Sequence, residues 1–191
     1  MAQRSAGPAV TLRPVTAQDE EFLCSVYAST RQEELAGVAW SEQQKAAFLW
    51  QQCSAQHHHY REHYTGATYD VIEVDRCPAG RLYVARWEHE IRIMDIALLP
   101  EHRGRGVGTV LLRQVLDEAA RTGRRVSIHV EKFNPARRLY HRLGFVETVD
   151  RGVYVLMVWP EGDSRMSPED SLVPQAGFVG PDRHDEQVEA P

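Results

Sequence analysis

The chain has 191 residues, of which 42% are hydrophobic and 26% are charged, and its formal net charge at pH 7 is -5. These values are ordinary for a soluble globular protein, and the length fits a single domain with a real core. No stretch approaches the roughly 20 apolar residues that span a bilayer, and residues 1–8 lack the apolar core of a secretion signal. We therefore expect neither a membrane protein nor an exported one.

The negative charge lies mainly near the end of the chain. Residues 161–191 hold eight acids and two arginines, which leaves a total of about +1 for residues 1–160. That near-neutral body lacks the positive excess typical of nucleic-acid-binding proteins. Because residues 161–191 are also rich in Pro, Gly and Ser, they are predicted to form a disordered acidic tail. Residues 1–9 are predicted to be a flexible lead-in, and residues 10–160 the folded domain.

The three cysteines, Cys24, Cys53 and Cys77, are odd in number and widely spaced. Their spacing indicates neither a disulfide framework nor a zinc motif. The sequence therefore predicts a reducing, cytoplasmic setting.

The first part of the domain is predicted to contain one strand and two helices. Val10–Arg13 reads as a short strand that Pro14 ends. Thr16 followed by Asp19 resembles a helix N-cap. Ser41–Gln44 forms a capping box that opens a second helix, which extends to about Tyr64.

The remaining elements alternate between strands and helices. Three strands come first, with turn chemistry at Cys77–Gly80 between the first two. The third strand is nearly all apolar, which is typical of a strand buried on both faces. A core-facing helix, a strand, a short helix and two strands follow. The first three strands are predicted at 71–74, 82–85 and 91–99. The long helix is predicted at 106–122, the next strand at 126–131, the short helix from Pro135 to just before Gly144, and the last two strands at 145–149 and 153–159.

A tight turn with three glycines separates the buried strand from the long helix. Glycines at 104, 106 and 108 let the backbone approach a ligand closely. The amides at the start of a helix have no intrahelical partner and lie at the positive end of its dipole, so they can hold phosphate oxygens. Arg103 and Arg105 add positive charge there. Taken alone, the turn is equally compatible with a simple chain reversal, because short glycine motifs often give false positives.

Two other phosphate-binding loops do not fit this turn. A Walker loop requires Gly-Lys-Ser or Gly-Lys-Thr, and a dinucleotide-binding fold requires G-x-G-x-x-G. Neither pattern is present, because the glycines here lie two positions apart.

The turn together with a second segment resembles a known family. Arg103-x-x-Gly106-x-Gly108, after a strand that ends in Ile96–Pro100, looks like motif A of the GNAT acetyltransferases. Residues 134–145 closely match the N-x-x-A-x-x-x-Y-x-x-x-G-F segment of that family. The resemblance covers roughly residues 10–159 and is weak before residue 66. It implies an α/β (α+β) fold, with a central mixed, mostly antiparallel, twisted sheet of about seven strands flanked by about four helices.

The resemblance also implies how acetyl-coenzyme A, the co-substrate, is bound. The backbone amides between Arg103 and Thr109 are expected to hold the pyrophosphate, and the edge of the strand near Ile96–Leu98 is expected to pair with pantetheine. Asn134 is expected to reach the pantetheine arm. The expected cofactor-binding residues are Ile96, Ala97, Leu98, Arg103, Gly104, Arg105, Gly106, Val107, Gly108, Thr109, Asn134, Arg137 and Tyr140.

Transfer of an acetyl group to an amine requires loss of an amine proton and protonation or tolerance of the leaving thiolate. The resemblance places Tyr140 near the thioester sulfur as the proton donor; otherwise Tyr140 is a packing aromatic. Two carboxylates are candidate bases. Glu90 stands where some relatives carry a catalytic glutamate, and Asp95 lies in an apolar strand, where burial makes a carboxylate more basic. Each is also compatible with a structural role, and ordered water can replace a base.

The histidines at 57, 58, 59 and 63 form a further cluster. His59 and His63 are four apart, so a helix could bring them to one metal. A solvated helix face explains them better, and no metal is expected. Residues 40–69 are expected to border the acceptor pocket, with aromatic candidates Trp40, Trp50, Tyr60 and Tyr64.

The sequence thus predicts an N-acetyltransferase that acts on a primary amine of a small molecule or a protein. A non-catalytic acyl-coenzyme A sensor or partner module is the alternative, and an interaction protein that recruits a partner through its acidic tail is a third. No nucleic acid or membrane partner is expected. The oligomeric state is left open, with a homodimer as one option.

Overall fold

The computed structural model describes residues 8–160, so residues 1–7 of the predicted lead-in and the predicted tail, 161–191, lie outside the described residues. Within 8–160 the order of elements is the predicted one, and the fold class is confirmed. The strands are β1 Val10–Pro14, β2 Thr68–Val74, β3 Cys77–Arg86, β4 Glu90–Leu98, β5 Arg125–Glu131, β6 Val146–Arg151 and β7 Tyr154–Trp159. The helices are α1 Glu20–Leu35, α2 Glu42–His63, α3 Val107–Thr122 and α4 Arg137–Arg142, with 3-10 turns at Ala17–Asp19 and Pro100–His102.

All seven strands belong to one sheet in the order β1-β2-β3-β4-β5-β7-β6. Neighbouring strands are antiparallel except for β4 and β5, which are parallel. The parallel pairing covers only Glu90–Ile93 of β4 against Arg125–Ile128 of β5. Beyond Ile93 the two strands separate, so the second half of β4 has a partner only on the β3 side. We call 90–93 the closed half of β4 and 94–98 its open half.

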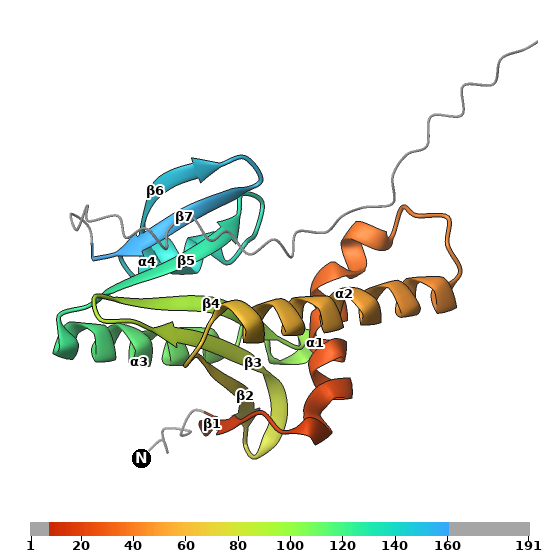
Figure 1. The fold of residues 1–191 in the computed structure, drawn as a ribbon, viewed down its shortest axis with the longest axis horizontal. Coiled ribbons are helices and arrows are strands. Elements are labelled where there is room, and N and C mark those ends of the chain that lie inside the picture. The colour runs from red at the N-terminus through yellow and green to blue at the C-terminus, as the bar shows by residue number, and fades with distance from the viewer. Residues whose placement is uncertain (1–7, 161–191) are drawn as a thin grey trace, which may run out of the picture.

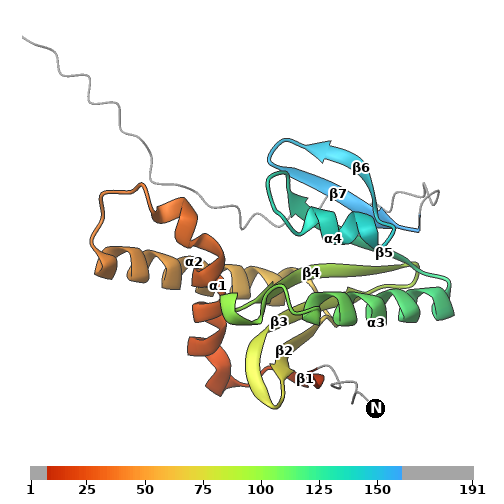
Figure 2. The ribbon, with the colours of Figure 1, turned by 180° about the vertical axis from the view of Figure 1, so that it is seen from behind.

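Helix α3 lies against the sheet on one face, and α4 lies on the same side beside β5 and β7 (Figure 2). The predicted apolar stripe of α3 is buried in the main core, at Val107, Leu111 and Val115. Burying such a stripe is the main source of stability for an amphipathic helix. Gly123 ends α3 in the left-handed conformation, at φ +66°, as its position predicted.

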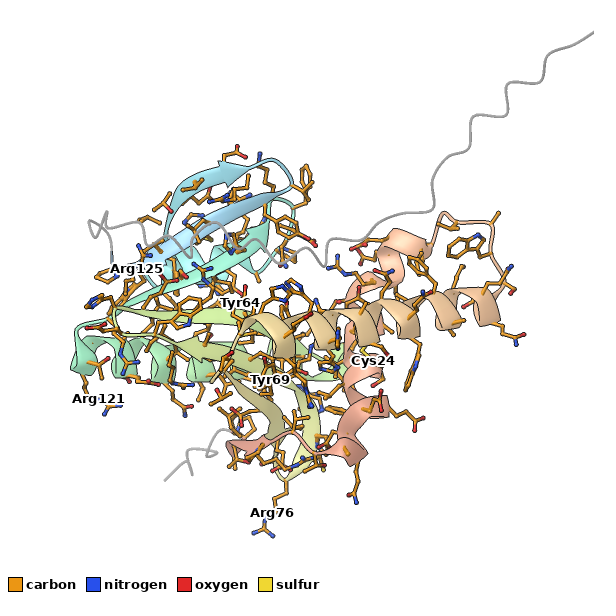
Figure 3. The ribbon with its side chains drawn as sticks, in the orientation of Figure 1. Cys24, Tyr64, Tyr69, Arg76, Arg121 and Arg125 are labelled. Carbon is orange, nitrogen blue, oxygen red and sulfur yellow. A yellow bond between two sulfur atoms is a disulfide. The ribbon has the colours of Figure 1, made fainter. Side chains whose placement is uncertain are left out.

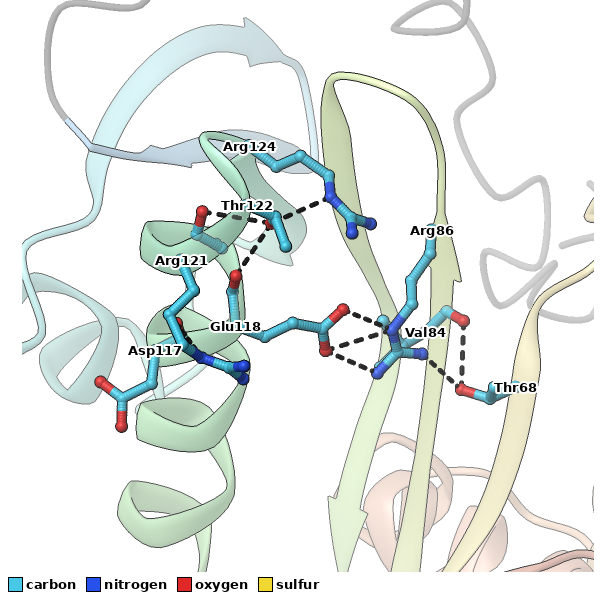
Figure 4. Close-up of polar contacts among 9 residues, drawn as sticks. Thr68, Val84, Arg86, Asp117, Glu118, Arg121, Thr122 and Arg124 are labelled. Carbon is cyan, nitrogen blue, oxygen red and sulfur yellow. Dashed lines mark hydrogen bonds and ion pairs between the residues drawn. The ribbon is translucent and has the colours of Figure 1, made fainter.

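An ion pair ties the last turns of α3 to the sheet (Figure 4). The carboxylate of Glu118 accepts hydrogen bonds of 2.9–3.2 Å from Arg86 in β3, and Arg86 also donates to Thr68 Oγ1 at 2.9 Å. The hydrogen bond from Arg86 lowers the pKa of Glu118. The pair thus links α3 to β3 near the end of the helix that lies opposite the glycine turn.

Helices α1 and α2 cross each other, and α2 runs over the face of the sheet opposite to α3 (Figure 1). The predicted capping box opens α2: Ser41 Oγ accepts from the Gln44 amide at 3.2 Å, and Gln44 Oε1 accepts from the Ser41 amide at 2.9 Å. Tyr60 of α2 is buried against Tyr83 and Met94 of the sheet.

A disulfide joins Cys24 of α1 to Cys53 of α2, with 5.6 Å between their Cα atoms; Figure 3 labels Cys24. The prediction from cysteine number and spacing was therefore wrong, because the two residues are 29 positions apart and only the crossing of the helices brings them together. The bond also removes cysteine usage as an argument for a reducing compartment. Cys77 is free and exposed.

The turn between β2 and β3 is a second correction. It lies at Asp75–Arg76, both in the left-handed region (φ +51° and +68°), and not at Cys77–Gly80, which belongs to β3. Pro78 is accommodated because it lies opposite a register shift between Ile72 and Glu73, and a bulge is one of the few places where a strand tolerates proline.

Candidate active site

The glycine turn leads directly into α3 and exposes the start of that helix. The first helical hydrogen bond runs from the Val110 amide to Gly106 O at 3.0 Å, so the amides of residues 107–109 precede it. Gly106 has φ +83°, a conformation that favours glycine. A Cβ built on Gly104 or Gly106 would meet no protein atom within 4 Å. The turn therefore leaves open space around Gly104 and Gly106, directly before these amides, where an anionic ligand could approach.

The two arginines of the turn behave differently from each other. The Arg103 amide donates to Pro100 O at 3.1 Å, and its guanidinium donates to Leu98 O at 2.8 Å and to Ser29 Oγ at 3.0 Å. Arg103 thus anchors the turn to β4 and α1, and its own amide is already used. Arg105 is exposed.

The open half of β4 presents backbone groups to the gap beside it. Leu99 donates its amide to Ala79 O, and Ala97 O lies so close to β3 that a Cβ on Gly80 would be 2.2 Å from it. Because alternate residues of a strand direct their backbone groups to opposite edges, Ile96 and Leu98 face the gap. Of the three predicted pantetheine contacts, these two have suitably directed backbone groups and Ala97 does not.

A cavity of about 170 Å³ lies where β4 and β5 separate. It is lined by both strands, by the loop that precedes α4 and by α1 and α2. Its volume is small compared with the roughly 300–1,000 Å³ of drug-sized sites. The lining residues are Tyr27, Thr30, Arg31, Gln56, Tyr60, Arg81, Met94, Asp95, Ile96, Ala97, Ile128, His129, Val130, Glu131, Asn134, Tyr140 and Tyr154.

Tyr140 of α4 lines this cavity and is only 4% exposed. Its ring packs edge-on against Phe145, with centroids 5.7 Å apart. Burial raises the pKa of the Tyr140 hydroxyl, and the negative charge of Asp95 raises it further. The phenol is therefore neutral at physiological pH and can donate a proton or a hydrogen bond into the cavity.

Asp95 also lines the cavity, and it is ion-paired with a buried arginine. Arg81 Nη2 lies 2.7 Å from Asp95 Oδ2 and 2.9 Å from Gln56 Oε1. Burial disfavours the charged form of Arg81, but the charge of Asp95 offsets this, and the pKa of Arg81 is raised. A carboxylate is thus held at the wall of the cavity.

Glu90, the other predicted base, lies in the closed half of β4 and does not line the cavity. It is 2% exposed, and its two carboxylate oxygens accept hydrogen bonds from Arg92, Arg125 and Ser127. Figure 3 shows Arg125 at this end of the sheet, away from Cys24 on α1. The geometry of Glu90 is that of a structural ion cluster, so we do not assign it a role in proton transfer.

The segment before α4 places Asn134 at the cavity and Arg137 away from it. Asn134 Oδ1 accepts from the Ala136 amide at 2.9 Å, which leaves the Nδ2 group as a donor toward the cavity. Arg137 donates to Glu147 and to Lys132 O. The hydrogen bond from Arg137 lowers the pKa of Glu147. Arg137, predicted as a cofactor contact, therefore fastens the start of α4 to β6.

Helices α1 and α2 form one wall of the cavity, and only part of that wall was predicted. Among the four aromatic candidates, Tyr60 lines the cavity. Tyr64 stacks on Trp87, Trp40 packs on Phe48, and Trp50 is 44% exposed. Sequence reasoning missed Tyr27, Arg31, Gln56 and Arg81. The spacing of Tyr27 and Arg31, one helical turn apart, was an available signal for a shared face of α1.

The histidines do not form one site. His57 Nε2 lies 2.5 Å from the Tyr83 hydroxyl, whereas His59 and His63 stack on each other with centroids 4.2 Å apart. Within residues 8–160, no three His, Cys, Asp or Glu side chains are grouped so that they could hold a metal ion.

None of the helices in that range is long and apolar enough to cross a membrane.

Comparison with known proteins supplies independent information on the chain. The model of the Acetyltransferase (GNAT) family matches residues 24–145. Streptothricin acetyltransferase of Streptomyces lavendulae is 39% identical over 82 residues, which are 41% of this chain and 43% of the relative. L-methionine sulfoximine/L-methionine sulfone acetyltransferase of Salmonella typhimurium is 45% identical over 51 residues, 26% of this chain and 30% of that protein. The matched parts thus span less than half of each curated relative.

Solved structures share the fold at low sequence identity. PaiA N-acetyltransferase from Thermoplasma acidophilum, in complex with coenzyme A, superposes with a TM-score of 0.60 and 16% identity over 78% of this chain and 98% of that one. Mycobacterium smegmatis RimJ, in complex with CoA-disulfide, has a TM-score of 0.56 and 21% identity over 84% of this chain and 89% of that one.

Proposed function

Because the chain belongs to the acetyltransferase (GNAT) family, we propose that it transfers an acetyl group from acetyl-coenzyme A directly to a primary amine of a small molecule. The observation that carries the proposal is the cavity between β4 and β5: it lies beside an unpaired strand edge and holds a neutral, buried Tyr140 and an ion-paired Asp95. The two curated relatives, both acetyltransferases by name, support it.

In this proposal the cofactor is bound mainly by backbone. The amides of Val107, Gly108 and Thr109 hold the pyrophosphate at the positive end of the α3 dipole. The backbone groups of Ile96 and the amide of Leu98, whose carbonyl already accepts from Arg103, pair with the amide groups of pantetheine, as a further strand would. Asn134 adds a side-chain donor. The thioester then lies at the cavity, next to Tyr140.

The reaction requires one bond to form and one to break. The amine nitrogen attacks the thioester carbon, a C–N bond forms, and the C–S bond breaks. Tyr140 gives its proton to the leaving thiolate, while Asp95 receives the acceptor amine and the proton that the amine loses. A buried phenol suits the first role because burial favours its neutral form. Direct transfer needs no acyl-enzyme, and the free thiol of Cys77 lies outside the cavity lining.

The test is turnover with acetyl-coenzyme A and a panel of primary amines, followed by release of the free thiol and by mass spectrometry of the acetylated product. Release that depends on the amine supports the proposal. Binding of acetyl-coenzyme A by calorimetry without turnover on any amine would instead indicate a non-catalytic acyl-coenzyme A module.

Two matched glycine variants test whether the glycine turn binds coenzyme A. Gly106→Ala and Gly123→Ala both place a side chain at a left-handed position, at opposite ends of α3, and neither Cβ meets a protein atom within 4 Å. Both should cost about 1 kcal/mol of stability. Only Gly106→Ala should weaken coenzyme A binding, by tenfold or more. Equal affinity in the two variants would remove this turn from the binding site.

A further inference from the structure

Arg81 is a buried cation whose hydrogen-bonding capacity is mostly unused. Arg81 is only 2% exposed, and it lines the cavity. A guanidinium carries five N–H donors. Nη2 serves Gln56 and Asp95, but Nε and Nη1 have no hydrogen-bond partner among residues 8–160. Buried polar groups are nearly always hydrogen-bonded, so two unpaired nitrogens on one guanidinium at the wall of the cavity indicate a missing ligand group. Arg31, the other arginine of the lining, has one such nitrogen, Nε.

Two aromatic rings also stabilise the charge of Arg81. Its guanidinium carbon lies 5.7 Å from the Tyr27 ring centre and 5.4 Å from that of Tyr83. Such contacts favour the cation through the ring faces. They also hold the guanidinium in place, so an anion would meet a preorganised partner.

The charges of the cavity lining also limit which ligands can bind. Arg81 is paired with Asp95, and Arg31 is paired with Glu131 at 2.8 Å across the gap between α1 and β5. Two cations and two carboxylates leave no net charge, so the lining has no excess of acid to attract a polyamine. It presents both signs within one small space, which complements a molecule that also carries both signs.

We propose that the acceptor is a small zwitterion of the α-amino-acid class, whose carboxylate is bound by Arg81 and whose amine is received by Asp95. Because the two side chains are in contact, the amine and the carboxylate of the acceptor must be close neighbours in the molecule. This inference rests on the proposed function and adds the substrate class and a specificity-determining residue, Arg81.

The first experiment uses the wild-type protein with acetyl-coenzyme A. Each amino acid of a standard set is compared with its carboxamide and with the amine that lacks the carboxyl group, with rates corrected for the free-amine fraction at the working pH. For the best side chain, kcat/KM should be at least tenfold higher for the acid than for either analogue. Equal or faster turnover of the analogues overturns the zwitterion proposal but leaves the N-acetyltransferase intact. Turnover of no amine in the whole set means that the proposed function has failed.

The second experiment assigns the preference to Arg81. In Arg81→Gln, the ratio of kcat/KM between acid and carboxamide should fall to within about twofold, mainly through KM for the acid, and Arg81→Lys should restore part of it. Arg31→Gln is the matched control: it also removes a cavity arginine, but Arg31 is already paired with two carboxylates, Glu34 at 2.7 Å and Glu131 at 2.8 Å, so the ratio should be unchanged. If Arg81→Gln lowers the rates for acid and carboxamide equally, Arg81 has only a structural role. If Arg81→Gln does not fold, the uncharged variant Arg81→Met takes its place, and a ratio equal to that of the wild type in that variant overturns the assignment.

Discussion

The two halves of β4 each carry a buried or half-buried carboxylate, but in different surroundings. In the closed half, Glu90 is enclosed by Arg92, Arg125 and Ser127, and β5 covers the strand edge. In the open half, Asp95 also has an arginine partner, Arg81, but it faces a cavity. The comparison teaches that a carboxylate in a buried strand is not in itself a catalytic candidate. What distinguishes Glu90 from Asp95 is whether β5 still pairs with β4 at that position.

The largest effect is expected in the closed half. Glu90→Gln leaves Arg92 and Arg125 without their carboxylate, and breaking a buried ion cluster in this way costs about 3–5 kcal/mol. Chemical denaturation should show that loss, with kcat of the folded fraction little changed. Asp95→Asn is the matched variant on the same strand, and it should lower kcat more than Glu90→Gln does. The reverse order of the two kcat values would show that the halves have been assigned the wrong way round.

The next effect concerns the helices that cover the open half. Replacing both Cys24 and Cys53 by Ser removes a cross-link between residues 29 positions apart, and chain entropy predicts a loss of about 3–4 kcal/mol. Tyr27 and Gln56 each lie one helical turn after one of these cysteines and line the cavity, so KM for the acceptor should rise as well. Thermal unfolding with and without reductant checks the prediction, and the Cys77→Ser variant is the control. An unchanged melting temperature on reduction would contradict it.

Within the open half, Tyr140→Phe removes only a hydroxyl. We expect kcat to fall about 100-fold, equivalent to about 2.7 kcal/mol of transition-state stabilisation. The Kd of coenzyme A should be unchanged, because the ring still packs on Phe145. Rapid-mixing kinetics together with calorimetry separate the two quantities. Full activity in this variant would exclude Tyr140 as the proton donor.

The smallest expected effect is a pH dependence of the stability, which arises at His57 of α2. Burial lowers the pKa of His57 to about 4, and the charges of Arg81 and Arg61 contribute. In the unfolded chain His57 takes up its proton near pH 6.5. Between pH 6.5 and 4 the unfolded state therefore binds more protons than the folded state. Stability should therefore fall as the pH falls through that window, by on the order of 1 kcal/mol after allowance for solvent screening.

Urea denaturation at several pH values measures this dependence. In His57→Gln, which can still form a hydrogen bond with the Tyr83 hydroxyl, the slope between pH 6.5 and 4 should be smaller than in the wild type. The same slope in both proteins would mean that other groups cause the loss.

Local patterns in the sequence determined the elements of this protein and one side of its site. The apolar run of β4, the glycines before α3 and the stripe at Val107, Leu111 and Val115 each act over a few residues, so spacing alone indicated strand, turn and helix. Asn134 and Tyr140 were predicted through the resemblance of segment 134–145 to the GNAT family, and both line the cavity. The hairpin turn was misplaced because two left-handed residues, Asp75 and Arg76, carried no glycine signal.

Only the tertiary structure decided what depends on contacts between distant residues. The separation of β4 from β5 after Ile93 opens the cavity, and it assigns Glu90 and Asp95 to different environments. The disulfide between α1 and α2, and the ion pair of Arg81 with Asp95, likewise join residues that are far apart in sequence or lie on different strands. Pairing of this kind follows from how whole elements pack, which no local spacing in the chain records.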